Sequence, residues 1–280
     1  MKVVIFSDVQ ANLPAMEAAV EQILDLHADL VIMDGDLVNR GPSSRACVET
    51  FDQLRRQLGW LPVKGNHEAW ILRCLRVAPR DALEAQMRQF ADWTALQVRD
   101  RLDALENWPD HLCFHGAHEA SWVHVTHGTM AGNRIGITAN LADEEIRGQL
   151  PDDIALFVTA HTHRPLEREL DGVPILNVGS VGSPFDGDVR GSYAILEERR
   201  GRWHWEIVRF HYDRTRAQQD FEDSGFLEGG GPLTHILFEE WRQARLLMPL
   251  WRREFEPSVL AGERELAPAV EAFLRVATAP

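Results

Sequence analysis

The first part of the chain alternates short apolar runs with amphipathic segments. Residues 2–7 and 30–33 are apolar runs bounded by turn residues, a pattern typical of strands that a parallel sheet buries on both faces. The apolar positions between these runs share one helical face, and Asn12 and Pro14 suit the cap and first turn of that helix. The pattern therefore predicts that the chain opens with a β-α-β unit.

Similar elements continue to about residue 211. Helices are expected at residues 44–58, where Gly59 ends the pattern, and at residues 141–150. From residue 69 to residue 107 the pattern is helical, with an interruption near Pro79. It predicts a helical insertion at about residues 69–110 that caps the site. Further strands are expected at residues 60–63, 112–114, 122–126, 154–159, 173–178, 192–196 and 203–210, the last two as a hairpin.

The last seventy residues have a different character, and we expect residues 212–280 to form a helical extension of a catalytic domain that covers residues 1–211. Helices are expected at residues 214–223 and 234–248, with Pro249 bending or ending the second. The apolar stripe of the second helix could pack on its own domain, which we favour, or could join two copies of the chain as a homo-oligomer. The stripe consists of Leu237, Trp241, Ala244 and Met248.

Composition narrows the class of protein. With 280 residues and 45% hydrophobic side chains, the chain can bury one large core. Its formal net charge of −14 argues against a nucleic-acid partner, which would need clustered Lys and Arg. No apolar run is long enough for a membrane span or a signal peptide, so we expect a cytoplasmic protein without a membrane partner.

Six short segments supply metal-binding side chains, and each lies at or just past the carboxyl end of an expected strand. Because the carboxyl ends of parallel strands meet at one rim, these side chains are expected to share a site. Carboxylate, amide and imidazole groups without thiolate suit Mn²⁺, Fe, Zn²⁺ or Ni²⁺ better than Ca²⁺ or Mg²⁺. Asp36 could bridge two such ions, and nearby Arg40 could hold a phosphate oxygen. The side chains are Asp8, Gln10, Asp36, Asn66, His67, His127, His161 and His163.

Over about residues 1–210 the chain resembles the calcineurin-like metallophosphoesterase family. The resemblance implies an α/β fold, a four-layer αββα sandwich with a dinuclear metal site at its strand ends. Here that fold would carry the helical cap and the C-terminal helices. The motifs that carry the resemblance, in chain order, are Asp8-Val9-Gln10, Gly35-Asp36, Asn39-Arg40-Gly41-Pro42, Gly65-Asn66-His67-Glu68, Thr126-His127-Gly128, His161-Thr162-His163 and Asn177-Val178-Gly179-Ser180.

The resemblance also assigns roles. Asp8 and His163 would hold the first metal, with Asp36 as the bridge to the second. The second metal would be bound by Asn66, His127 and His161. His67 would act beside the scissile ester as a catalytic residue. Arg40 would bind the substrate phosphate and act in catalysis, with Lys64 and Asn39 as further substrate-binding residues.

Two departures from the family pattern bear on activity. Gln10 stands where the first motif usually has a histidine, and it could either bind the first metal weakly or hydrogen-bond a neighbouring loop. Asn39 replaces an aspartate that orients the residue corresponding to His67, so His67 would be a poorer acid.

These features together predict a metal-dependent phosphatase or phosphodiesterase that acts on a small soluble substrate. The resemblance implies two divalent ions, Mn²⁺ first and Fe, Zn²⁺ or Ni²⁺ as alternatives, which would supply a bound hydroxide as nucleophile. Two alternatives stay open. One is a dinucleoside polyphosphate hydrolase, which Gln10 and the Asn39-Arg40 pair favour, and the other is a binding scaffold without catalysis on the same fold.

Overall fold

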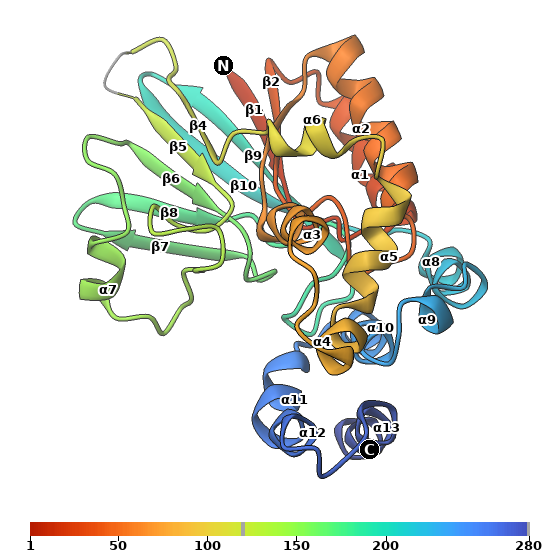
Figure 1. Cartoon of the computed structure of the whole chain (residues 1–280). Coiled ribbons are helices and arrows are strands. Elements are labelled where there is room, and N and C mark those ends of the chain that lie inside the picture. The colour runs from red at the N-terminus through yellow and green to blue at the C-terminus, as the bar shows by residue number, and fades with distance from the viewer. Residues whose placement is uncertain (119–120, 279–280) are drawn as a thin grey trace.

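The computed structural model describes residues 1–118 and 121–278, and over these residues the chain forms two five-stranded mixed sheets (Figure 1). Strands β1, β2 and β3 are parallel in the first sheet, as are β5, β6 and β8 in the second. The first sheet has the order β10 (Arg202–Phe210), β9 (Gly191–Arg199), β1 (Lys2–Phe6), β2 (Leu30–Asp34) and β3 (Leu61–Val63). The second has the order β4 (His111–Phe114), β5 (Val123–Thr126), β6 (Leu156–Thr159), β8 (Val173–Asn177) and β7 (Leu166–Leu170).

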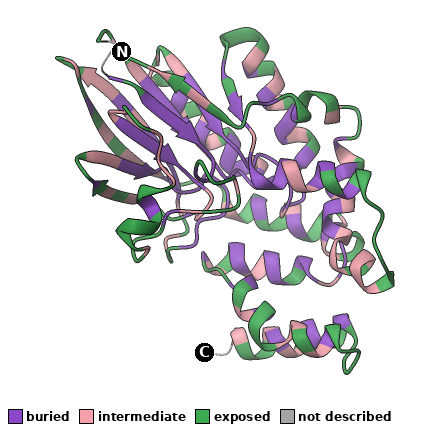
Figure 2. Cartoon of the chain, turned by 60° about the vertical axis from the view of Figure 1, so that its left-hand side comes forward, coloured by how far each residue is buried: buried purple, intermediate pink, exposed green. Residues whose placement is uncertain are grey.

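Strand β1 is buried on both faces, as its uninterrupted apolar pattern predicts. Val3 and Ile5 pack in the core between the two sheets, together with Val125 and Val158 of the second sheet. Val4 and the other alternate positions of β1 pack in the core beneath the flanking helices. In Figure 2 the inner strands of the two sheets form the buried centre of the molecule.

Helices flank both sheets. α1 (Leu13–Asp25) and α2 (Ser44–Leu58) cover the outer face of the first sheet, and α7 (Asp143–Arg147) packs on the second. The capping predictions are confirmed, since Asn12 Oδ1 accepts from the Ala15 amide at 3.2 Å and Gly59 ends α2 with φ of 72°. The expectation of two sheets flanked by helices, with further helices at the C-terminus, is confirmed.

The segment expected to form a helical insertion is helical. It contains α3 (Asn66–Arg76), α4 (Ala82–Met87), α5 (Gln89–Gln97) and α6 (Leu102–Glu106), and the break expected near Pro79 separates α3 from α4. Helices α3 and α5 contact each other, and α5 also contacts the C-terminal helix α9.

The C-terminal helices share one core with the insertion. Leu237 and Trp241 of α10 and Met248 of α11, three residues of the expected stripe, belong to this core, so they pack within the chain. The same core contains Phe90 of α5 and Phe273 of α13. In Figure 1 the helices at the C-terminal end lie at the bottom, below α4. The helices are α8 (Arg214–Asp223), α9 (Phe226–Gly229), α10 (Thr234–Gln243), α11 (Met248–Glu254), α12 (Glu256–Leu260) and α13 (Leu266–Ala277).

Three expectations about elements were wrong. The helix expected at residues 234–248 ends at Gln243, because Ala244 adopts the left-handed conformation with φ of 50°. Pro249 does not bend that helix, since it lies in the first turn of α11, where proline needs no amide hydrogen. Strand β7 was not expected, and the helix at residues 141–150 shrinks to α7.

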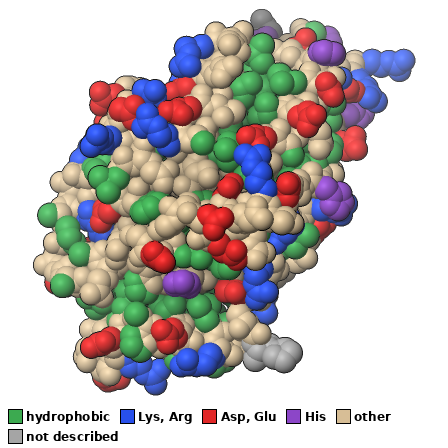
Figure 3. Space-filling model, turned by 90° about the vertical axis from the view of Figure 1, so that its right-hand side faces the viewer, with side chains coloured by type: hydrophobic (Ala, Val, Ile, Leu, Met, Phe, Trp, Pro, Cys, Tyr) green, Lys and Arg blue, Asp and Glu red, His purple; other side chains and the backbone are tan. Residues whose placement is uncertain are grey.

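One face of the molecule carries both signs of charge side by side. On the face that carries α1 and α8, acidic and basic side chains are interspersed (Figure 3). Among the described helices, none combines the length and the apolar character that a membrane span requires.

Candidate metal centre

The candidate ligands leave the two sheets at neighbouring strand ends. We expected the rim of one sheet, and the rim is instead shared by two sheets. Strands β1, β2 and β3 of the first sheet each lead to one ligand, and β5 and β6 of the second lead to the others. All of these side chains are buried or half-buried. The group is Asp8, Asp36, Asn66, His127, His161 and His163.

The loops that carry these ligands turn sharply because several of their residues have positive φ. Such a conformation costs on the order of 1–3 kcal/mol for a residue other than glycine, so the surrounding structure must hold it in place. Gly35, with φ of +83°, makes the turn before Asp36, and a Cβ there would lie 2.6 Å from His127 Nδ1. The non-glycine residues concerned include Asp8, Gln10, Asp36, His161 and His163, with φ between 52° and 65°.

Asp36 belongs to two sets of metal-binding atoms. It forms one set with Asp8 and His163, and another with His127 and His161. Within each set the ligand atoms lie within 4.8 Å of one another. A carboxylate common to two adjoining sets is well placed to bridge two cations.

The first set brings acceptor atoms face to face. His163 Nδ1 donates to the Ser183 carbonyl oxygen at 2.5 Å, which leaves its Nε2 free to bind a cation. That Nε2 lies 3.0 Å from Asp8 Oδ1, which is buried and has no hydrogen-bond partner among the described residues. Two such atoms attract each other only when a proton or a metal ion lies between them. The residues of this set therefore fit a divalent cation.

The second set has the same character. His127 Nδ1 lies 2.7 Å from the Asp34 carbonyl oxygen, so it donates there and its Nε2 faces the site. Asn66 Oδ1 lies 3.0 Å from that Nε2 and 2.6 Å from His161 Nδ1. Asp36 Oδ2 lies 3.4 Å from His127 Nε2. These nitrogen and oxygen atoms match the donors that Mn²⁺, Fe and Zn²⁺ accept.

The electrostatics of the centre favour positive charge. Burial lowers the pKa of His127, but Asp36 and Asp8 outweigh this effect and raise it well above its usual value. Burial raises the pKa of Asp36, but His127 and His67 outweigh it and hold that pKa well below its usual range. The centre therefore stabilises a positive charge next to its carboxylates, which a proton or a metal ion can supply.

His67 is held beside the centre by a polar network. Thr94 Oγ1 donates to Asn39 Oδ1 at 3.0 Å, which orients the Asn39 amide so that its Nδ2 donates to His67 Nδ1 at 2.9 Å. Burial lowers the pKa of His67 to about 3, so the ring is neutral at pH 7. Because Nδ1 accepts a hydrogen bond, the ring proton is on Nε2, which lies 3.9 Å from Asp36 Oδ2.

Arg40 reaches the centre but shares its guanidinium with the C-terminal helices. Its Nη2 forms an ion pair with Glu240 of α10, a fully buried carboxylate. The guanidinium carbon also lies 5.4 Å from the ring centroid of Phe185, which stacks on His163. Arg40 also lines the cavity that opens over the centre.

A cavity of about 510 Å³ opens over these groups. Its wall includes the ligands Asp36 and His163 and the two other functional candidates, Arg40 and His67. Trp70 of α3 and Leu237 of α10 also line it, so both the insertion and the C-terminal helices contribute to its wall.

The motifs, the two sheets and this centre agree with a known family. A model of the calcineurin-like phosphoesterase superfamily domain matches residues 1–201. The chain belongs to this superfamily.

The similarity to individual proteins extends over most of the chain. An uncharacterized protein of Methanocaldococcus jannaschii, MJ0912, is 26% identical, and the match covers 78% of this chain and 90% of the relative. The crystal structure of a metallophosphoesterase from Sphaerobacter thermophilus superposes with a TM-score of 0.68 at 26% identity, covering 87% of this chain and 99% of that one. The hypothetical protein PH1004 of Pyrococcus horikoshii shares the fold, with a TM-score of 0.66 at 14% identity over 83% of this chain and 97% of that one.

Gln10 of the phosphoesterase domain lies in the centre, but its amide nitrogen faces the ligands. Nε2 lies 2.9 Å from Asp36 Oδ2 and 3.4 Å from His163 Nε2. Its Oε1 is buried and makes no hydrogen bond to any described residue. In this orientation Gln10 forms a hydrogen bond with the Asp36 loop, which is the second of the two alternatives expected from the sequence. If the amide group were rotated, Oε1 would face the first metal.

The structure does not bring two of the expected substrate-binding residues to the cavity over the candidate metal centre. Lys64 Nζ donates to the carbonyl oxygens of Glu106 and Trp108, both at 3.2 Å, so it anchors the end of the insertion. Asn39 is fully buried and orients His67. Neither placement supports direct contact with substrate.

Glu68 has a larger role than the sequence indicated. A negative charge in the first turn of α3 is favourable in itself. The Glu68 carboxylate also accepts from the amides of Asp36 and Gly65 at 2.9 Å and of Leu37 at 2.8 Å. Glu68 therefore ties the Asp36 loop to the Asn66 loop, and its place in the Gly65–Glu68 motif was the available signal.

Proposed function

We propose that this protein is a hydrolase of phosphate esters that works with two divalent metal ions on a small soluble substrate. The observation that carries the proposal is the position of Asp36, which belongs to both ligand sets in the wall of a cavity. Arg40 and His67, which can bind and polarise a phosphoryl group, line the same cavity. The superfamily supports a phosphoesterase, and the mechanism and substrate are our proposal.

Five side chains besides the bridge Asp36 would hold the metals. They form two groups, Asp8 with His163 and Asn66 with His127 and His161, and Mn²⁺, Fe, Zn²⁺ or Ni²⁺ would suit both. When bound, such ions activate water at neutral pH and reduce the charge on the phosphoryl oxygens.

Arg40 and His67 would act on the ester directly. Arg40, oriented by Glu240, would donate to phosphoryl oxygens and stabilise the negative charge that grows on them in the transition state. His67 carries its proton on Nε2, which the Asn39 contact fixes, so it would donate a hydrogen bond to a phosphoryl oxygen or to the leaving oxygen.

A narrower candidate is a dinucleoside polyphosphate hydrolase. A second cavity of about 430 Å³ favours it, since this cavity shares Trp70 and Arg134 with the cavity over the candidate metal centre. The two cavities together offer room for the second nucleoside of such a substrate. A binding scaffold without catalysis is the rival from another class. The ligands Asp8, Asp36, Asn66, His127, His161 and His163 argue against it, because a scaffold has no need to keep them together.

A metal-supplemented hydrolysis screen tests the proposal. Protein stripped with a chelator is supplied with Mn²⁺, Fe²⁺, Zn²⁺ or Ni²⁺ and assayed with p-nitrophenyl phosphate, bis(p-nitrophenyl) phosphate and diadenosine tetraphosphate. We expect metal-dependent turnover of at least one ester, and its loss in His161→Ala. Protein that binds two metals and turns over none of the three would favour the scaffold.

A further inference from the structure

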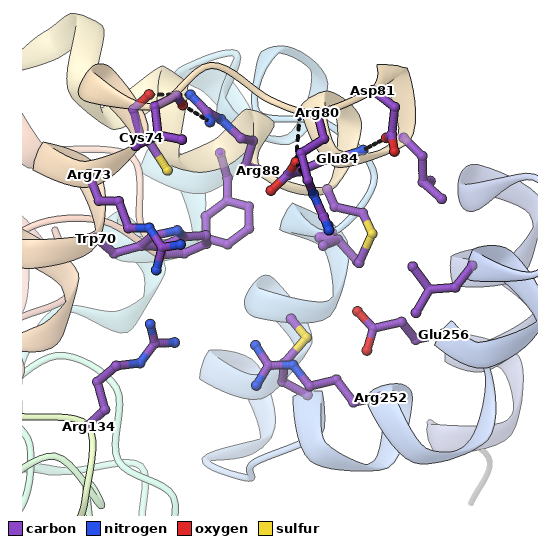
Figure 4. A pocket seen from close by; sticks show the side chains of 17 residues that line it. Trp70, Arg73, Cys74, Arg80, Asp81, Glu84, Arg88, Arg134, Arg252 and Glu256 are labelled. Carbon is purple, nitrogen blue, oxygen red and sulfur yellow. Dashed lines mark hydrogen bonds and ion pairs between the residues drawn. The ribbon is translucent and has the colours of Figure 1, made fainter.

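A second cavity continues from the one over the candidate metal centre. It measures about 430 Å³ and is lined by α3 and α4 of the insertion and by α11 and α12 of the C-terminal helices (Figure 4). The two cavities share Trp70, Phe90, Arg134, Met248 and Arg252 as lining residues. A ligand bound at the metals could therefore extend past Trp70 into the second cavity.

The second cavity concentrates positive charge on an acidic protein. Five arginines and three carboxylates line it, although the whole chain has a formal net charge of −14. Arg80 is neutralised by Glu84, 2.9 Å away, and Arg88 by Asp92, 3.1 Å away. Asp81 caps α4 by accepting from the Glu84 amide.

The other three arginines have no such partner. Within residues 1–118 and 121–278, Arg73, Arg134 and Arg252 form no ion pair with a carboxylate within 4.0 Å. The charge of Arg252 does act on Glu256, because it offsets part of the rise that burial causes in the pKa of that carboxyl. In Figure 4 the guanidinium groups of all three point into the space beside Trp70. Glu256 enters from α12, on the opposite side of Arg252 from Arg134 in that view. Three unpaired guanidinium groups around one space form a site for an anion, and phosphate matches the fork of an arginine best.

Trp70 forms the boundary between this space and the metal centre. Its ring centroid lies 5.9 Å from that of His67 on one side and 4.9 Å from that of Phe90 on the other. The side chain is half-buried, so part of the indole is open to a ligand. Aromatic side chains in such positions bind flat apolar groups, nucleobases in particular.

We propose that Arg73, Arg134 and Arg252 bind a second phosphate group of the substrate, while a nucleoside or similar aromatic body packs against Trp70. The substrate class is then a phosphate ester with a second phosphate at a separate position. The inference rests on the proposed function, because it assigns the scissile phosphate to the metal centre.

Two chromogenic esters that differ by one phosphate test this proposal. They are the p-nitrophenyl ester of thymidine 5′-phosphate and the same ester with a 3′-phosphate. We expect kcat/KM to be about ten-fold or more higher for the 3′-phosphorylated ester, since a charged contact contributes about that factor. Arg73→Ala and Arg252→Ala should bring this ratio close to one.

Arg253→Ala is the matched control. Arg253 follows Arg252 in α11, pairs with Glu254 and lines neither cavity, but its replacement removes the same charge. The control should keep the ratio of the unchanged protein. A ratio of one in the unchanged protein, or an equal fall in Arg253→Ala, would overturn the proposal.

A binding measurement separates this proposal from the proposed function. Calorimetric titration of metal-free protein with thymidine 3′,5′-bisphosphate should give a Kd that Arg73→Ala weakens about ten-fold and Arg253→Ala does not. If neither ester is hydrolysed, this titration decides. A Kd that Arg73→Ala weakens supports the anion site even when the hydrolase proposal fails. A Kd that Arg73→Ala leaves unchanged refutes the anion site.

Discussion

Arg40 lines the cavity over the candidate metal centre, and in our account it binds substrate rather than metal. We predict that Arg40→Ala keeps its metal content and loses tens to hundreds of fold in kcat/KM, since one charged contact to a transition state contributes about 2–4 kcal/mol. Metal analysis and steady-state kinetics on the best ester check this. The control is Arg45→Ala, which removes an exposed arginine paired with Glu49. An unchanged kcat/KM would mean that Arg40 serves only its ion pair with Glu240.

Gln10 offers a second prediction for a single residue. An amide binds a divalent ion more weakly than imidazole does, so the first metal should dissociate more readily than the second. Gln10→His should tighten that site, measured by titrating metal-free protein with Mn²⁺. If both dissociation constants stay unchanged, Gln10 acts only through its contact with Asp36.

The residue positions predicted from the sequence depended on motif and spacing, and the structure brings residues together where a motif fixes the local geometry. The ligands at the strand ends converge as expected, and Asn39 contacts His67. Lys64 did not behave as expected, because its ammonium group finds carbonyl oxygens of the insertion. The Arg40–Glu240 pair joins residues that are 200 positions apart in the sequence, and a local sequence pattern cannot predict such a contact.

Helix α10 connects the C-terminal helices to the site through Glu240. This carboxylate pairs with Arg40 and also accepts from the amides of Leu247 at 2.7 Å and Met248 at 2.6 Å, so it fixes the turn into α11. The helices after residue 212 therefore orient Arg40 in the wall of the cavity over the candidate metal centre.

We predict that Glu240→Gln lowers the free energy of unfolding by about 3–5 kcal/mol, because it leaves the half-buried Arg40 without its charge partner. Urea unfolding measures the change. Glu239→Gln is the matched control, since it breaks a more exposed pair with Arg242 that is worth about 0–1 kcal/mol. Equal effects of the two substitutions would show that the Glu240 pair is not structurally important.

At the level of elements, the hydrophobic pattern predicted the central strands and α8 well, but it did not separate α10 from α11 and did not predict α12 or α13. β1 and β2 were predictable because they are apolar throughout. β7 was missed because its Leu166 and Leu170 are separated by charged residues, as suits an edge strand. The end of α10 was missed because Ala244 carries none of the signals that glycine gives at such a turn.

The molecule as a whole should gain stability from metal. Buried carboxylates and imidazoles that face one another repel or compete for protons until a cation joins them. We predict that Mn²⁺ at one hundred times its Kd raises the free energy of unfolding by about 2.7 kcal/mol per site, and that a chelator reverses this. Melting temperature with and without metal checks the effect, and His161→Ala should reduce it. If no divalent ion changes the melting temperature, the ligand sets do not bind metal and serve only the fold.

The most direct measurement is the metal content of the unchanged protein against that of Asp36→Asn. Asp36 is the ligand that both sets share, and an amide bridges two cations poorly. After loading with Mn²⁺ and gel filtration, we predict two metal ions per chain in the unchanged protein. In Asp36→Asn, with an unchanged circular dichroism spectrum, we predict one ion or none and the loss of nearly all hydrolysis. Two ions and normal turnover in Asp36→Asn would contradict the account.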